Sequence, residues 1–151
     1  MKAEFFGKEA ARPADYGFAR QLYALTMRDI IELAFGWDEY RQDLSFARQY
    51  VQSEVRIITL NGRDIGWLQT RSVGPTLHLF QFYIAPRWQN QGLGSLVLKR
   101  VLAQAEKRGW NVALSVMKEN PARRLYERHG LRATHEDRYK VYMRTISPSR
   151  R

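Results

Sequence analysis

The sequence predicts a mixed α/β fold in which one mostly antiparallel sheet carries helices on its faces. Three observations support this fold class. Extended apolar runs alternate with runs of helical spacing, and an Asn61-Gly62 pair separates two strand-like segments. A glycine-containing turn also joins an apolar strand to a long helical run. We expect the order β-α-α-β-β-β-α-β-α-β-β, with about six or seven strands and about four helices.

In the first half, turn and cap residues mark the element boundaries. Asn61-Gly62 supplies the two positive-φ positions of a tight hairpin, and Val73-Gly74-Pro75 turns the chain again. The expected elements are a strand up to Ala11, a helix from Pro13 to Ala34, a helix from Glu39 to about Ser53, and strands 55–60, 64–72 and 76–85.

In the second half, glycines end both expected helices. The first helix follows the glycine turn and ends at Gly109; the second begins at Asn120-Pro121, with Asn as cap, and ends at Gly130. Between and after them we expect extended segments at 112–116, 131–134 and 139–143.

Composition narrows the class of protein. At 151 residues with 44% hydrophobic content, the chain fits a single domain over residues 1–151, with a flexible basic tail over about 146–151. The absence of cysteine excludes disulfides and thiol nucleophiles, and three scattered histidines give no metal-ligand spacing. No signal peptide or membrane-length segment is present in the sequence, so we expect a cytoplasmic protein without metal or membrane partner.

Positive charge is concentrated in the second half. The net charge is +10; residues 1–86 carry ten basic and ten acidic side chains, whereas residues 87–151 carry fifteen and five. This half should attract an anion, such as a phosphorylated cofactor, an acidic surface or nucleic acid. Part of the excess can equally be a solvated surface.

The turn Gln89–Gly94 is typical of a phosphate-binding device. A P-loop would need Lys-Ser/Thr after its last glycine, and a dinucleotide fingerprint would need a third glycine where Val97 stands. What remains is Gln-x-x-Gly-x-Gly, in which backbone N–H groups and the positive end of a helix face an anion. An ordinary strand–helix connection without ligand would show the same residues.

Two motifs resemble those of the GNAT family of acetyl-CoA-dependent N-acetyltransferases. The first is Ile84-Ala85-Pro86, Trp88 and then Gln89-Asn90-Gln91-Gly92-Leu93-Gly94. The second is Ser115-Val116, Asn120-Pro121-Ala122, Leu125-Tyr126-Glu127 and Gly130-Leu131. Their order and distance match the family, and the resemblance covers nearly the whole chain. It implies a sheet splayed in the middle.

The resemblance implies that the backbone holds acetyl-CoA. Its pyrophosphate would lie on the turn from Gln89 to Ser95 (Gln89, Asn90, Gln91, Gly92, Leu93, Gly94, Ser95), and its pantetheine arm along the backbone of Phe82, Tyr83 and Ile84. Lys99, Arg123, Arg124 and Arg128 are candidates for the outer phosphate. Asn120 lies six residues before Tyr126 instead of the commoner seven, so it either contacts the pantetheine or only caps its helix.

The resemblance also implies roles in transfer to a primary amine by direct attack. Tyr126 matches the family tyrosine that protonates the departing thiolate; the alternative is a core tyrosine of an amphipathic helix. His78 stands where many members have a glutamate, so it is a candidate base, or else a structural histidine. Another family position for a carboxylate is Ser115, a poor base, and a water chain without a dedicated base is a further alternative.

The resemblance implies an acceptor pocket between the first two helices and the loop that joins the last strands. Between the first two helices the chain offers Trp37, Asp38 and Glu39, which would suit a cationic amine. Alternatively, Trp37 packs in the core and Asp38 caps the second helix. His135, Glu136, Asp137 and Tyr139 would border the other side. A small-molecule amine and a protein amine are both open as acceptor.

Two other classes of protein remain. One is a catalytically silent acyl-CoA-binding sensor of the same fold. The other is a basic nucleic-acid-binding module, which is disfavoured because the sequence contains no helix-turn-helix or aromatic RNA-binding strand motif. A homodimer is possible.

Overall fold

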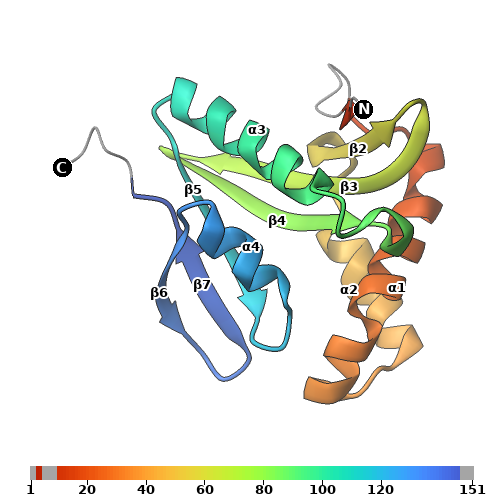
Figure 1. The fold of residues 1–151 in the computed structure, drawn as a ribbon. Helices are drawn as coiled ribbons and strands as arrows, with labels where there is room; N and C mark the ends of the chain where they lie inside the picture. The colour runs from red at the N-terminus through yellow and green to blue at the C-terminus, as the bar shows by residue number, and fades with distance from the viewer. Residues whose placement is uncertain (1–2, 5–9, 147–151) are drawn as a thin grey trace. The chain divides into compact units, whose positions relative to one another are not determined.

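The computed structural model describes residues 3–4 and 10–146. Within them, one sheet has the strand order β1-β2-β3-β4-β5-β7-β6, and four α-helices accompany it (Figure 1). Strands β4 and β5 pair in parallel, whereas the β1–β2, β2–β3, β5–β7 and β6–β7 pairs are antiparallel. The predicted fold class, a mixed and mostly antiparallel sheet with four helices, is confirmed. The predicted tail lies outside the described residues except for Ile146.

The chain forms two compact units. The first unit consists of residues 1–69 and 81–89, and the second of residues 70–80 and 90–151. Strands β3 and β4 each contribute residues to both units.

The first unit contains the first two helices and the first hairpin. Its elements are β1 (Ala3–Glu4), α1 (Tyr16–Phe35), α2 (Glu39–Gln49), β2 (Val55–Leu60), most of β3 (Arg63–Val73) and the end of β4 (Thr76–Ile84). The β2–β3 turn has the expected positive φ at Asn61 and Gly62, 51° and 79°. The hairpin prediction is therefore confirmed.

Two boundary predictions in this unit are wrong: residues 10–11 do not belong to a strand, and α2 ends at Gln49, not near Ser53. Tyr50 is extended and packs its ring against Tyr16 and Trp67, with centroids 4.9 Å and 5.8 Å away. Tertiary packing of this aromatic side chain therefore accompanies the end of the helix, and residues Gln52–Glu54 form a short 3₁₀ turn.

The core of the first unit is an aromatic cluster around Trp67. The Trp67 side chain is fully buried, and the rings of Phe46 and Tyr83 lie 5.9 Å and 5.3 Å from it. Gly66 permits this packing, because a Cβ there would lie 2.2 Å from the carbonyl oxygen of Tyr83. The absence of a side chain at residue 66 thus lets β4 approach β3 closely.

The second unit contains the other two helices and the last three strands. These are α3 (Leu93–Lys107), β5 (Asn111–Met117), α4 (Ala122–Arg128), β6 (Arg132–Glu136) and β7 (Lys140–Arg144), together with residues 70–73 of β3 and 76–80 of β4. Helix α3 buries Leu93, Val97, Leu98, Val101 and Ala105 at helical spacing and packs against β5.

Cap residues set the boundaries of the helices in the second unit. Gly109, at φ 70°, follows the end of α3, and Gly130, at φ 90°, follows α4. The Asn120 side-chain oxygen accepts a hydrogen bond of 2.9 Å from the Ala122 N–H at the start of α4. Asn120 therefore acts as the helix-capping residue that the sequence predicts.

We predict that Gly66→Ala lowers the free energy of unfolding by at least about 2 kcal/mol, because the added methyl group meets backbone that cannot move independently. Gly17→Ala is the control: it lies in α1 with nothing within 4 Å of the new Cβ, and should be neutral or stabilising by about 0.5–1 kcal/mol. Urea denaturation measures both. Equal stability of the two variants would contradict the close β3–β4 packing.

Candidate active site

The start of α3 offers backbone N–H groups to an anion. Asn90 and Gly92 precede the helix with left-handed φ values of 61° and 80°. Gly92 is the N-cap residue and provides no side-chain cap, and Leu96 N–H donates to the Gly92 carbonyl at 3.1 Å. The N–H groups of Leu93, Gly94 and Ser95 therefore have no acceptor within the helix, and they stand at its positive end.

The two glycines of the turn differ in what they require. Gly92 needs to be glycine for its backbone, since its φ of 80° strains other residues. Gly94 is helical, and a Cβ there would meet only the Leu125 side chain, at an ordinary 3.4 Å. Neither backbone strain nor packing within the protein requires glycine at residue 94. A ligand that approaches the backbone at this residue would require it.

Ser95 in the first turn of α3 is linked to His129, just after α4. The Ser95 hydroxyl lies 3.0 Å from His129 Nε2. Partial burial, with Lys99 and Arg128 nearby, lowers the pKa of His129 and favours the neutral ring. Sequence reasoning missed this pair, because the residues are 34 positions apart and neither belongs to a recognisable motif.

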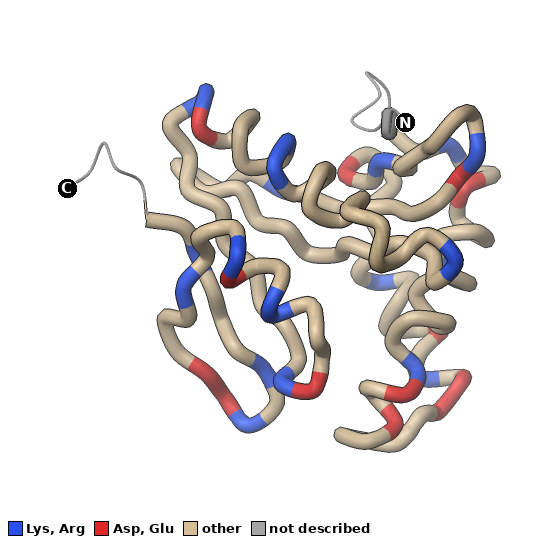
Figure 2. Tube along the Cα trace, viewed as in Figure 1, with Lys and Arg blue, Asp and Glu red and all other residues tan. Residues whose placement is uncertain are grey.

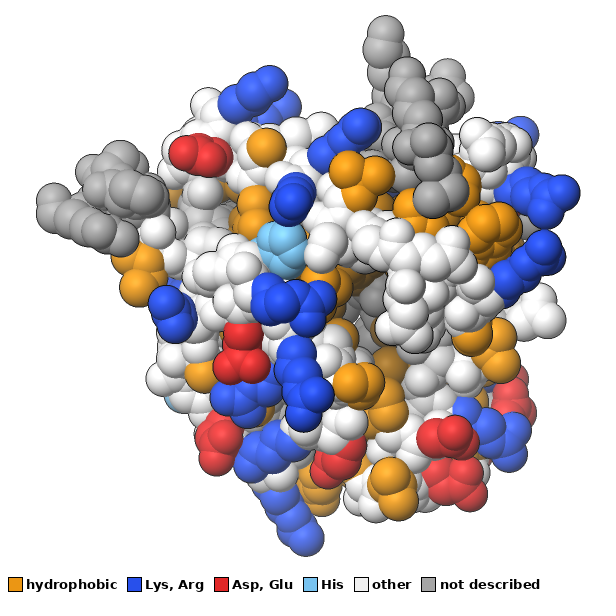
Figure 3. All heavy atoms as spheres, in the orientation of Figure 1, with side chains coloured by type: hydrophobic (Ala, Val, Ile, Leu, Met, Phe, Trp, Pro, Cys, Tyr) orange, Lys and Arg blue, Asp and Glu red, His pale blue; other side chains and the backbone are white. Residues whose placement is uncertain are grey.

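Basic side chains surround these two helices. Lys and Arg gather along α3 and α4 (Figures 2 and 3). They include Lys99 and Arg100 on α3 and Arg123, Arg124 and Arg128 on α4. The Arg123 guanidinium lies 3.7 Å from the Glu127 carboxylate, so part of its charge is offset within α4. The charge excess predicted from the sequence thus has a defined surface in the second unit.

In the first unit, Gln89 braces the end of β4. Its side-chain N–H donates to the Ile84 carbonyl at 2.8 Å, and the Ala85 N–H donates to the Ile65 carbonyl at 2.7 Å. The Tyr83 hydroxyl donates to the Gln81 side chain. The Gln89 side chain thus fixes the strand end from which the turn begins.

The two predicted catalytic residues belong to the second unit. Tyr126 is buried on α4, and this burial raises the pKa of its phenol, so the group stays protonated at neutral pH. His78 is half-buried on β4 opposite Ala113, and its ring stacks with Phe80 at 5.8 Å.

A cavity of about 340 Å³ opens beside His78. Its lining includes Phe80, Ser115, His135, Tyr142 and Arg144, but not Tyr126. The His135 and Tyr142 rings are stacked at 4.4 Å, and the Tyr142 hydroxyl donates to Asp137 Oδ2 at 2.8 Å. Of the predicted acceptor-side residues, His135 therefore lines the cavity and Asp137 supports it through Tyr142.

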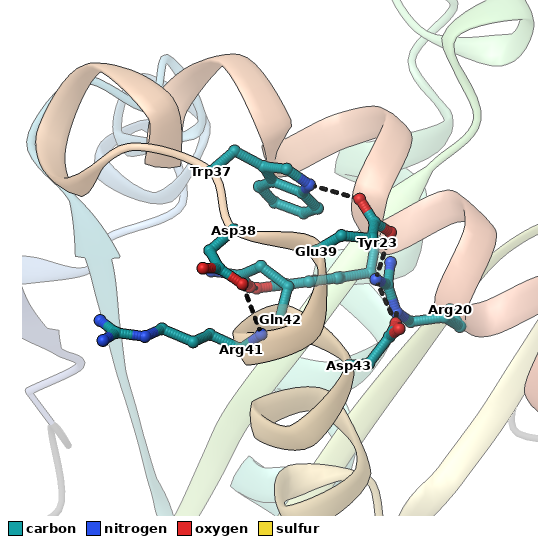
Figure 4. Close-up of polar contacts among 8 residues, drawn as sticks. All are labelled: Arg20, Tyr23, Trp37, Asp38, Glu39, Arg41, Gln42 and Asp43. Carbon is teal, nitrogen blue, oxygen red and sulfur yellow. Dashed lines mark hydrogen bonds and ion pairs between the residues drawn. The ribbon is translucent and has the colours of Figure 1, made fainter.

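The predicted acceptor residues of the first unit are engaged with their own neighbours (Figure 4). Asp38 Oδ1 accepts from the Arg41 N–H at 3.0 Å and so caps α2. Glu39 accepts from Trp37 Nε1 at 2.7 Å and from Arg20 at 3.0 Å. Arg20 was not anticipated from the sequence, and its charge offsets the carboxylate that was predicted to attract an amine.

The described residues contain neither a metal-binding cluster nor a membrane-length helix. No group of three His, Cys, Asp or Glu side chains in residues 3–4 and 10–146 could hold a metal ion. In the same residues no helix is both long and apolar enough to cross a membrane.

The chain belongs to the acetyltransferase (GNAT) family, whose model matches residues 19–131. Similar solved structures include the PaiA N-acetyltransferase of Thermoplasma acidophilum in complex with coenzyme A (15% identity, TM-score 0.75, 96% of this chain and 99% of that one). A second is the ribosomal-protein-S18-alanine N-acetyltransferase of Escherichia coli (22% identity, TM-score 0.62, 97% and 94%). A third is Ard1 of Thermoplasma volcanium (17% identity, TM-score 0.68, 97% of this chain and 98% of that one). These likenesses establish the fold. No curated protein matches the chain.

The Asp137–Tyr142 bond gives a prediction. The pKa of Tyr142 is raised, first by its hydrogen bond to Asp137, because ionisation loses that bond and places a phenolate beside a carboxylate. Asp137→Asn should therefore lower the Tyr142 pKa, as measured by NMR titration of the tyrosine ring. Glu136→Gln, which removes the neighbouring carboxylate that pairs with Lys118, is the control and should leave it unchanged. An unchanged Tyr142 pKa in Asp137→Asn would contradict the hydrogen bond between Tyr142 and Asp137.

Proposed function

We propose that the protein is an N-acetyltransferase that moves the acetyl group of acetyl-CoA to a primary amine. One observation carries the proposal beyond family membership: α3 begins at a left-handed glycine without a side-chain cap, and a second glycine follows that neither strain nor packing requires. Both features favour a large anion on the backbone N–H groups. We also propose that residues 1–151 form one acetyltransferase domain.

The residues of this chain that would hold acetyl-CoA are mostly backbone groups. The N–H groups from Asn90 to Ser95 would bind the pyrophosphate, and the β4 backbone from Phe82 to Ile84 would pair with the pantetheine amides. Because the Ile84 carbonyl already accepts from Gln89, this pairing would rest on the remaining groups. Asn120 and Arg123 would lie nearby, and the basic side chains of α3 and α4 would offset the phosphate charges.

Acetyl-CoA supplies an acetyl thioester. The neutral amine nitrogen bonds to the carbonyl carbon as the C–S bond breaks, the amine loses one proton, and the thiolate gains one. Tyr126, whose phenol is protonated at neutral pH, would donate the proton to the thiolate. His78 would accept the amine proton, directly or through water, from its place on β4 beside the cavity.

We predict that Gly94→Glu abolishes the rise in melting temperature that acetyl-CoA causes in the native protein. The variant adds a side chain and a negative charge at the second residue of α3, where the pyrophosphate would bind. A ligand at 100 times its Kd stabilises by about 2.7 kcal/mol, so the native shift should be several degrees.

Gly17→Glu is the matched control, because it adds the same charge at the second residue of α1. It should keep the full acetyl-CoA shift. If folded Gly94→Glu also keeps that shift, the cofactor is not bound at the α3 turn.

We predict that Tyr126→Phe lowers kcat for amine acetylation by about 10²-fold or more while leaving the Kd for acetyl-CoA nearly unchanged. A thiol-release assay with a panel of amines measures kcat, and calorimetry measures Kd. An unchanged kcat, with chemistry shown to be rate-limiting, would remove Tyr126 from the mechanism. Binding of acetyl-CoA without thiol release on any amine would favour the silent sensor.

We predict that His78→Gln lowers kcat/KM by about 10²-fold at neutral pH, again without a change in acetyl-CoA affinity, because the variant keeps a polar side chain but cannot accept the amine proton. Adding a small imidazole base to the assay should restore part of the rate. A near-normal rate in His78→Gln would make His78 a structural residue.

A further inference from the structure

The cavity of the second unit arises from small residues on β5. In the sheet, Ala113 stands between His78 on β4 and Arg144 on β7, and Ser115 stands opposite Tyr142. The side chains at 113 and 115 are short, whereas their neighbours are long. The result is a hollow with β5 as its floor and larger side chains of β4 and β7 as its walls.

The hollow lies on the sheet face opposite the apolar core. Along β5, buried Val112, Leu114 and Val116 alternate with Ala113 and Ser115, which are half-buried and exposed. Helix α3 lies on the buried face, since it packs against β5 (Figure 1). The residues of the hollow therefore have room to contact a ligand.

Aromatic rings form its walls. On the β4 side, Phe80 is 46% exposed, stacks with His78, and carries the Arg71 guanidinium at 4.7 Å from its ring centre. On the other side stands the stacked His135–Tyr142 pair. Exposed aromatic side chains on two sides of a hollow favour a planar apolar group between them.

The charge of the hollow is positive. Its lining includes Arg144 and no acidic residue. In the β6–β7 hairpin, Asp137 accepts hydrogen bonds from the Tyr142 hydroxyl and from the N–H groups of Tyr139 and Lys140, and Glu136 pairs with Lys118. In the part of the chain that the structure describes, no carboxylate pairs with Arg144.

We propose that this hollow binds the non-reacting part of the acceptor, and that this part combines an aromatic ring with a carboxylate on a short alkyl chain. The ring would lie over Ala113 and Ser115 between the aromatic walls, and Arg144 would bind the carboxylate. The acceptor class is therefore an aromatic amino acid or a similar aryl amine acid, not a polyamine. The role as acceptor rests on the proposed acetyl transfer; the binding of the ring and carboxylate does not.

Binding is tested first, without acetyl-CoA. Calorimetry with 3-phenylpropionate, which has the ring and the carboxylate but no amine, should show binding. 2-Phenylethylamine and propionate, which lack the carboxylate and the ring respectively, should each bind at least about 10-fold more weakly. Tighter binding of 2-phenylethylamine, or no binding of 3-phenylpropionate, would overturn the proposal.

Two arginine variants locate the site. Arg144→Gln should raise the Kd for 3-phenylpropionate by about 10-fold or more, as expected for loss of a charge-assisted hydrogen bond. Arg132→Gln is the matched control, because Arg132 pairs with Arg144 in the sheet but does not line the hollow. Ala113→Leu, which fills the floor, should remove binding. Equal affinities in Arg144→Gln and Arg132→Gln would contradict the assigned site.

Thiol release then separates this proposal from the proposed function. With acetyl-CoA, phenylalanine should be acetylated with a higher kcat/KM than 2-phenylethylamine or spermidine, and Arg144→Gln should reduce that preference. If spermidine is the better substrate, the proposed acetyl transfer is supported and the proposed acceptor class is wrong. If 3-phenylpropionate binds but no amine causes thiol release from acetyl-CoA, the hollow is a ligand site and the proposed function is wrong.

Discussion

The first N–H groups of α3 have no acceptor within the helix, and Gly92 provides no side chain to cap them. In many helices the side chain of a Ser, Thr, Asp or Asn residue caps such groups. Here the chain instead enters the helix through left-handed Asn90 and Gly92, and basic residues of α3 and α4 surround the same region. These features favour the binding of an anion at this helix terminus.

The second unit uses the two faces of its strands differently. Side chains such as Leu114 and Met143 form the core, while Ala113, Ser115, Tyr142 and His78 face the hollow. This division follows from the alternation of side chains along a strand. It lets one short strand, β5, contribute both to stability and to a candidate ligand site, so a substitution at 113 or 115 can change binding with little cost to the core.

Sequence reasoning predicted the local features well, because their causes are local. The Asn61-Gly62 hairpin, the Asn120 cap and the glycine after each later helix depend on the backbone preferences of single residues. The same holds for the turn at Gly92. The end of α2 was wrong because the Tyr50 ring packs against Tyr16 and Trp67, far along the chain.

The parts of the site that depend on tertiary contacts could not be read from the sequence. The pairing of Ser95 with His129 joins two elements without a shared motif. From their charge, Asp38 and Glu39 were predicted to attract an amine. In the structure Asp38 accepts from the Arg41 N–H and Glu39 accepts from Arg20, and the second contact depends on the packing of α1 against α2. The hollow over Ala113 likewise requires the β4–β5–β7 register.

We propose that backbone amides at the start of α3 bind the cofactor pyrophosphate. Amide NMR spectra of the protein titrated with coenzyme A test it most directly. The largest shifts, and the slowest hydrogen exchange on saturation, should fall on the amides from Asn90 to Ser95. Saturable binding that leaves these amides unshifted, with its changes elsewhere in the chain, would contradict the account.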